Sequence, residues 1–195
     1  MLSFIRYIPK NSIEKINFWT SKTNSTIRVS KKRFTKLGDF KVISDKLYIS
    51  VNKDLNKYAF LLTLTHELAH AFTYINYKNT VLPHGKEWKN IFQYMLLELL
   101  EIPIFPQDIT TYLKIYAKNP KASTLSDINL YRALSNYDQI KSITISDIHR
   151  GKKFTVHNDC IYTKGDDLRK NIKCYNNNNG RIYLFHPLTK IKLLD

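Results

Sequence analysis

The residues best suited to chemistry are His66, Glu67 and His70, which form an H-E-x-x-H motif. Residues four apart on an α-helix lie on one face, about 40° apart around the axis and roughly 6 Å apart along it. Two imidazoles in those positions can bind one zinc ion. Glu67 is rotated by about 100° from His66, so its carboxylate borders the metal without having to ligate it.

A catalytic zinc site needs a third protein ligand and an open position for water. His84 follows His70 by fourteen residues, which is the length that a helix end and a reversing loop would need. A carboxylate from the following helix can also ligate zinc, so three glutamates are alternatives: Glu87, Glu98 and Glu101. His84 is favoured because it stands at the start of the next predicted helix, whereas two of the three glutamates stand deep within it.

An accidental motif would leave His66 and His70 as ordinary core or surface histidines. The surrounding segment, LLTLTHELAHAF, is otherwise apolar, and burying an unpaired imidazole there would be costly. A metal would satisfy both rings. Zinc held by neutral imidazoles lowers the pKa of a bound water to about 7. Glu67 could then act as general base and pass the proton to a leaving amine, which predicts peptide hydrolysis without a covalent intermediate.

The elements that must position these residues can be read from hydrophobic spacing. Residues 11–21 predict a short amphipathic helix, and alternating apolar residues near 27–29, 40–42 and 47–51 predict three antiparallel neighbouring strands. The motif helix is expected at about 55–77. Further helices are expected at about 85–101, 107–118 and 126–136.

The character of the chain changes after residue 140, where short apolar segments alternate with turn signals. Strands are expected at 154–156, 160–162, 172–174, 182–184 and 191–193. The predicted organisation is a metallopeptidase domain over residues 1–120, a helical connection over 121–140 and a small, basic β module over 141–195.

The segment HELAHAFTYINYKNTVLPHGKEW resembles the SprT-like metallopeptidases, the family that includes the Spartan proteases. Their pattern is H-E-x-x-H followed by H-G-x-x-[FW], which is matched by six residues: His66, Glu67, His70, His84, Gly85 and Trp88. The resemblance is specific over roughly residues 26–100. It implies an α+β, zincin-like domain with one Zn²⁺ per chain, a small sheet and an H-E-x-x-H helix. For the Spartan branch it also implies cleavage of proteins crosslinked to DNA.

The C-terminal module departs from the zinc ribbon found in many members of this family. A ribbon needs two tight ligand pairs, but only His157 and Cys160 are closely spaced here. A second metal bound by those two residues with Cys174 and His186 stays an open alternative. The favoured interpretation is a degenerate ribbon without metal, held by its apolar strands. A disulfide between the two cysteines is not expected in a reducing compartment.

The charge of the chain points to a polyanionic partner. It carries 31 Lys and Arg against 16 Asp and Glu, a net charge of +15. Residues 1–60 are net +9 and residues 121–195 net +6, whereas residues 61–120 sum to zero. DNA, single-stranded or in nucleoprotein, is the favoured partner. The candidate contacts are Lys31, Lys32, Arg33, Lys152, Lys153, Arg169 and Lys170.

The expected function is a zinc-dependent endopeptidase acting on DNA-associated or DNA-crosslinked proteins. Two alternatives remain open: a zinc peptidase without DNA dependence, and a DNA-binding accessory protein with a structural metal. The segment near the start, MLSFIRYIPK, contains no apolar stretch of signal-peptide length, and no stretch of the chain reaches the roughly 18–20 apolar residues of a membrane span. A cytoplasmic location without a membrane partner is therefore expected.

Overall fold

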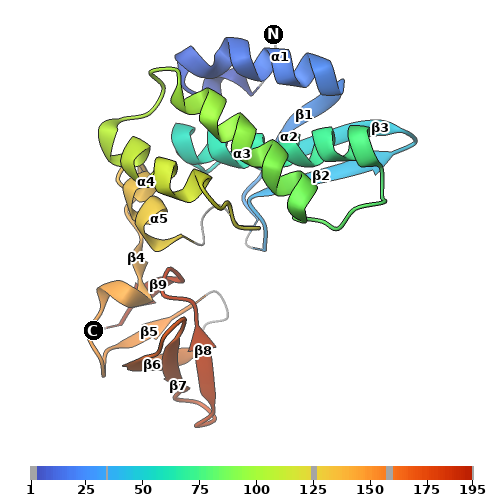
Figure 1. Ribbon diagram of the computed structural model, residues 1–195. Helices are drawn as coiled ribbons and strands as arrows, with labels where there is room; N and C mark the ends of the chain where they lie inside the picture. Colours follow the sequence, from blue (N-terminus) through green and yellow to red (C-terminus); the bar gives the residue numbers. More distant parts are fainter. Residues whose placement is uncertain (1–3, 34, 124–126, 157–159, 195) are drawn as a thin grey trace. The chain divides into compact units, whose positions relative to one another are not determined.

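The chain divides into two compact units, residues 1–139 and 140–195 (Figure 1). The structure, a computed structural model, describes residues 4–33, 35–123, 127–156 and 160–194. The described residues form helices and two sheets, joined by loops, so the predicted α+β class is confirmed. None of the described helices combines the length and the apolar character needed to cross a membrane.

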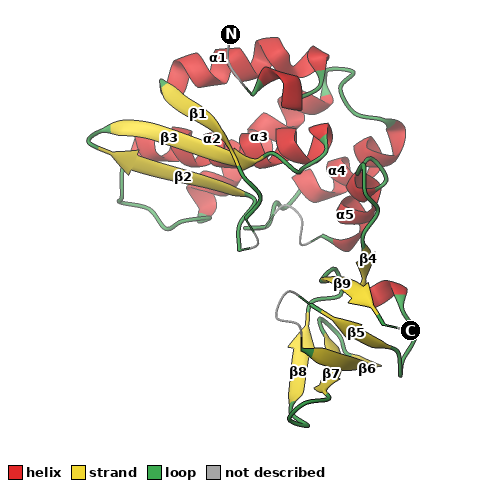
Figure 2. Ribbon diagram, turned by 180° about the vertical axis from the view of Figure 1, so that it is seen from behind, coloured by secondary structure: helices red, strands yellow, loops and turns green. Residues whose placement is uncertain are grey.

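A three-stranded sheet forms one layer of the first unit (Figure 2). Its strands are β1 (Ser25–Ser30), β2 (Gly38–Ile43) and β3 (Lys46–Asn52), in the order β1-β3-β2. The expectation of antiparallel neighbours is correct for β2 and β3 but wrong for β1, which pairs with β3 in parallel. The segment after β1 carries the chain past the position of β3 to the far edge, so that the returning β3 fills the centre and runs in the direction of β1.

The helices of the first unit are α1 (Ile13–Thr23), α2 (Lys57–Tyr77), α3 (Lys86–Leu100), α4 (Gln107–Ala117) and α5 (Ile128–Ser135). The motif helix α2 is central, since it packs against β2 and β3 and also against α1 and α3. Its apolar residues, among them Leu61, Leu64 and Leu68, are fully buried. The sheet and the surrounding helices therefore hold α2 as a fixed support for the H-E-x-x-H motif.

The second unit is a small six-stranded sheet in the order β4-β9-β5-β6-β7-β8. Its strands are β4 (Ile143–Thr144), β5 (Lys153–Thr155), β6 (Ile161–Asp167), β7 (Ile172–Asn176), β8 (Ile182–Phe185) and β9 (Lys190–Leu193). Its core contains Phe154, Tyr162 and Cys174. Cys174 and Cys160 are free thiols. His157, one of the residues suggested for a second metal, lies outside the described residues.

The first unit extends through α5, where the sequence suggested a helical connection. Asn56 links this helix to the start of α2. Its Oδ1 accepts hydrogen bonds from the backbone N–H groups of Tyr58 and Ala59 at 3.1 and 3.0 Å. Its Nδ2 donates to the carbonyl of Leu134 at 2.9 Å and to the carboxylate of Asp138 at 2.6 Å. One side chain therefore caps the motif helix and ties α5 to it.

Replacement of Asn56 should destabilise the first unit in two separable parts. Asn56→Ala removes the cap and the bonds to α5, and should lower the free energy of unfolding by about 2 kcal/mol. Asn56→Ser keeps a capping oxygen but cannot reach α5, so about half of that loss is expected. Urea unfolding of both variants measures the two parts, and equal losses would show that the cap contributes nothing.

Candidate functional site

Three histidine rings converge at one point of the first unit. His66 and His70 project from α2, and His84 comes from the loop between α2 and α3. The Nε2 atoms of His66 and His70 are 3.2 Å apart, and Nε2 of His84 lies 3.2 Å from the first and 3.0 Å from the second. The three ring nitrogens thus form a nearly equilateral triangle.

This triangle matches the requirements of a metal ion better than those of a hydrogen-bond network. Each neutral imidazole nitrogen offers either one proton or one lone pair, so three nitrogens cannot all bond to one another. Tetrahedral bonds of 2.0–2.1 Å would place the nitrogens about 3.3–3.4 Å apart, close to the observed separations. Within the described parts of the chain, these residues are the group of His, Cys, Asp and Glu side chains that could hold a metal.

The backbone between α2 and α3 brings His84 back to the helix. His84 has a φ of +58°, a left-handed conformation, and the next N–H, from Gly85, donates to the carbonyl of Leu82 at 2.9 Å. Gly85 is then the N-cap residue of α3. A tight turn directly before α3 therefore places the His84 ring over the two rings of α2.

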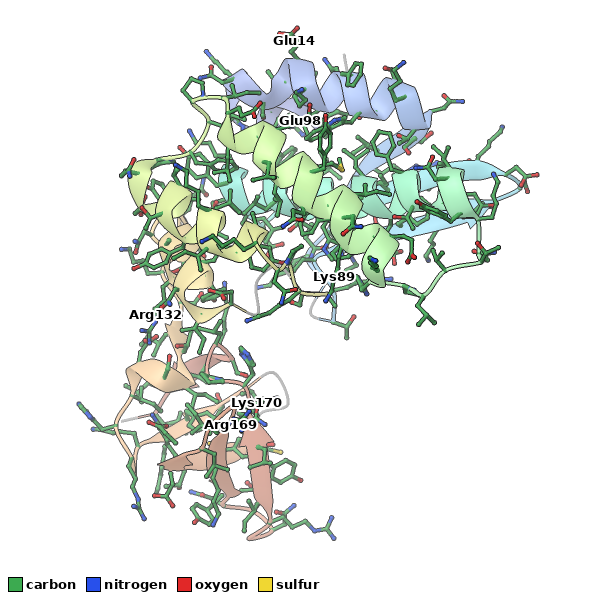
Figure 3. All side chains as sticks on the ribbon, in the orientation of Figure 1. Glu14, Lys89, Glu98, Arg132, Arg169 and Lys170 are labelled. Carbon is green, nitrogen blue, oxygen red and sulfur yellow. The ribbon has the colours of Figure 1, made fainter. Side chains whose placement is uncertain are left out.

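The glutamates considered as alternative ligands are not part of this group. Glu98 forms an ion pair with Lys15 of α1 at 3.0 Å. Glu101 follows the end of α3 and is exposed. Figure 3 shows Glu98 at the end of α3 that lies beside α1. The structure thus brings together the three histidines and leaves these carboxylates elsewhere.

Trp88 packs against all three histidine rings. It is fully buried, and its ring centroid lies 4.7 Å from that of His66, 5.2 Å from His70 and 4.7 Å from His84. The sequence identified Trp88 as part of the H-G-x-x-[FW] pattern, but did not predict its contact with the histidines. Its position four residues after His84, in the first turn of α3, is the feature of the sequence that could have indicated this contact.

Burial keeps the histidine rings neutral. Loss of solvent, together with a smaller effect of the neighbouring histidines, lowers the pKa of His66 to about 3 and that of His70 to about 4. Burial also lowers the pKa of His84. Neutral imidazole is the form that ligates metals, so these rings are ready for a cation at neutral pH without first losing protons.

Glu67 lies against the start of β2 and lines the same cavity as the three histidines. It is buried, and Gly38 packs directly on its carboxylate. A Cβ at position 38 would collide with Glu67 Oε1 and lie 2.8 Å from Thr63 Cγ2. Only glycine leaves room for the carboxylate here, so the first residue of β2 fixes where Glu67 lies.

The electrostatic surroundings of Glu67 are mixed. Burial raises its pKa to about 8, and the carboxylate of Asp39 acts in the same direction. The positive charges of Arg33 and Lys36 oppose that rise. A cation among the histidines would add to their effect and favour the ionised carboxylate.

An open cavity of about 570 Å³ gives access to these groups. Its walls come from the loop before β2, the start of β2, α2, the His84 loop and the segment after α4. The lining residues are Thr35, Lys36, Leu37, Gly38, Asp39, Phe40, Thr63, His66, Glu67, His70, Pro83, His84, Ala122 and Ser123. The three histidines are therefore accessible from solvent through this cavity.

Most of the proposed nucleic-acid contacts are exposed, but they belong to two different units. Lys31 and Lys32 lie after β1, with Lys32 Nζ 3.9 Å from Asp54. The other four are exposed in the second unit: Lys152, Lys153, Arg169 and Lys170. Figure 3 shows Arg169 and Lys170 next to each other.

Arg33 differs from the other candidate contacts because its guanidinium is directed into the protein. It donates to Asn52 Oδ1 at 2.8 Å and to Ser50 Oγ at 3.0 Å. Asn52 in turn donates to the carbonyls of Arg33 and Lys36, both at 3.0 Å. Arg33 therefore fixes the loop that precedes Gly38, a role the cluster of basic residues did not indicate.

Comparison with known proteins identifies the part of the chain that holds this site. The model of the SprT-like family matches residues 10–104, which run from the start of α1 to just beyond α3. The match includes all three histidines, Glu67 and Trp88. No curated protein and no solved structure matches the chain. The resemblance inferred from the motif is thus confirmed for this segment.

The convergence of the rings predicts how the purified protein binds metal. It should contain about one zinc per chain, and His84→Ala should weaken zinc binding by at least about 100-fold because one of three ligands is lost. Atomic absorption and titration with a competing chelator measure both. His149→Ala, a change at an exposed histidine of the second unit, is the matched control and should keep one zinc. A content near two would instead indicate a second site.

Proposed function

Because residues 10–104 belong to the SprT-like family, we propose that the chain is a zinc-dependent endopeptidase that acts on DNA-associated or DNA-crosslinked proteins. The observation that carries the proposal is the triangle of Nε2 atoms, 3.0–3.2 Å apart, with Glu67 directly after His66 on the same helix. All of these groups open into one cavity.

The donor set favours a catalytic over a structural metal. Structural zinc sites are closed by four protein ligands, whereas catalytic sites have three and keep one position open. Within the described residues, the group contains three side chains and faces an open cavity. A zinc ion there would supply a Lewis acid for the scissile carbonyl and make water acidic near neutral pH.

The residues around the metal would have separate roles in metal binding and proton transfer. His66, His70 and His84 would hold the ion, and Trp88 keeps their rings in place by packing against each of them. Glu67 would accept a proton from the attacking water and transfer it to the departing amine. Its position between α2 and Gly38 restricts the carboxylate to the cavity wall, where both transfers take place.

The part of the proposal that concerns DNA is supported by charge. Exposed lysines follow β1 in the first unit, and four exposed basic residues lie in the second unit. Phosphate contacts of this kind supply affinity that does not depend on sequence. The alternative of a peptidase without DNA dependence gains some weight from Arg33, whose guanidinium is engaged within the protein.

Loss of the Glu67 carboxylate should stop proteolysis without releasing the metal. Glu67→Gln keeps the size of the side chain but cannot accept the proton, so the rate should fall by at least about 100-fold. The measurement is cleavage of a DNA-binding protein substrate by the zinc-loaded chain, with zinc content determined in parallel. Glu14→Gln, at an exposed position of α1, is the control and should keep full activity. Unchanged activity of Glu67→Gln would remove this residue as the base.

Dependence on DNA is tested by the same assay with and without single-stranded DNA. Cleavage should increase when the DNA is added, and DNA affinity should fall steeply as salt is raised. Replacing Lys152, Lys153, Arg169 and Lys170 together by alanine should weaken binding and reduce the slope of that salt dependence. Cleavage that ignores DNA and binding that ignores salt would favour a peptidase without DNA dependence.

A further inference from the structure

A second cavity, of about 390 Å³, lies directly beside the candidate metal site. His84 lines both cavities, so this residue is shared by the two. The lining of the second cavity is cationic and polar. It consists of His84, Gly85, Lys86, Lys89, Asn90, Gln93, Lys118, Asn119 and Pro120.

Two separate elements bring the lysines of this cavity together. Lys86 and Lys89 stand three residues apart at the start of α3 and share one face of it. Lys118 directly follows α4. The side chain of Gln93 joins these elements, since its Nε2 donates to the carbonyl of Ala117 at 2.7 Å and to that of Lys118 at 3.2 Å. These two bonds hold the end of α4 against α3, and the lysines of both elements line one cavity.

The three lysines of this cavity, Lys86, Lys89 and Lys118, take part in no ion pair within the part of the chain that the structure describes. Glu98 of α3 pairs with Lys15, and Asp108 of α4 accepts a hydrogen bond from Tyr137. Glu87 stands in the first turn of α3, so three lysines and one glutamate lie in this region. Figure 3 shows Lys89 and Glu98 towards opposite ends of α3. The net charge of zero over residues 61–120 thus conceals a local excess of positive charge next to His84.

We propose that this cavity is a subsite for an acidic side chain of the protein substrate, so that the enzyme prefers an aspartate or glutamate near the bond it cleaves. The inference rests on the proposed function, because it assumes that a polypeptide lies across His84. Successive residues of an extended chain advance by about 3.3 Å, so a residue close to the scissile bond can reach a neighbouring cavity.

A side-chain carboxylate suits this cavity better than a nucleic-acid phosphate does. A single carboxylate on a short stem can enter a small hollow, whereas a phosphate backbone requires a groove along which it can run. The amides of Asn90 and Asn119 stand among the lysines and can donate to a carboxylate. Two neighbouring ammonium groups and an amide would then surround one acidic group, as in charge-assisted recognition.

Peptide binding to the full-length, zinc-loaded Glu67→Gln chain tests the proposal without requiring turnover. The probes are three fluorescein-labelled octapeptides of alanine and serine whose two central residues are both glutamate, both glutamine or both lysine. Measured by fluorescence anisotropy at low salt, the glutamate peptide should bind about fivefold more tightly than the glutamine peptide. Lys89→Glu, added to the same chain, should abolish or reverse that preference, and salt should reduce it.

A matched control and a nucleic-acid arm separate the possible outcomes. Lys114→Glu changes the net charge equally at an exposed position of α4 outside the cavity, and should leave the preference intact. Equal binding of the glutamate and glutamine peptides, or an equal loss in both lysine variants, would overturn the proposal. So would a short oligothymidine whose affinity depends on Lys89 while that of the glutamate peptide does not, since this would assign the cavity to phosphate.

Cleavage profiling then distinguishes this inference from the proposed function itself. The zinc-loaded wild-type chain, acting on a peptide library, should yield products enriched in aspartate or glutamate at one position beside the cleaved bond, and Lys89→Glu should lose that enrichment. Absence of any cleavage, together with Lys89-dependent binding of the glutamate peptide, would refute the peptidase and leave the acidic subsite standing. Cleavage without acidic enrichment would refute the acidic subsite and leave the proposed peptidase activity standing.

Discussion

The burial of two imidazoles and a carboxylate in an otherwise apolar helix is the constraint on which this structure depends. Such groups are costly to bury unless each finds a partner. In α2 the ring nitrogens of His66 and His70 lie close to that of His84, at separations that suit a cation. A cation bound there would offset the free-energy cost of burying the rings. The left-handed turn at His84 and the placement of Trp88 beneath the rings both serve this arrangement.

The carboxylate of Glu67 is held by a different part of the fold. Buried Asn52 bonds to the carbonyls of the loop after β1, and Arg33 bonds back to Asn52. This network fixes the loop and thereby the start of β2, where Gly38 lies against Glu67. A sheet strand, a loop and a helix thus define one cavity wall, and the small size of a single residue decides whether the carboxylate has room.

The two cavities that meet at His84 differ in chemistry. One contains the histidines and Glu67, and the other is surrounded by lysines and amides. Because His84 belongs to both, a polypeptide held at the metal would pass close to the positive cavity. The same turn between two helices thus contributes to both cavities.

The sequence alone predicted which residues converge at the candidate site to a large extent. Residue identity and helical periodicity are local properties, so the motif, the third histidine, the family and most helices and strands could be predicted from the order of residues. Other features depend on contacts between segments far apart in the chain. These include the parallel pairing of β1 with β3, the packing of Gly38 on Glu67 and the inward direction of Arg33.

Tertiary structure also determined where the charged residues near the site lie in space. Residues 61–120 sum to zero net charge in the sequence. Folding places Lys86, Lys89 and Lys118 around one hollow and leaves Glu98 paired with α1. A sum along the chain cannot reveal such separation, because electrostatic interactions depend on distance in space and not on position in the sequence.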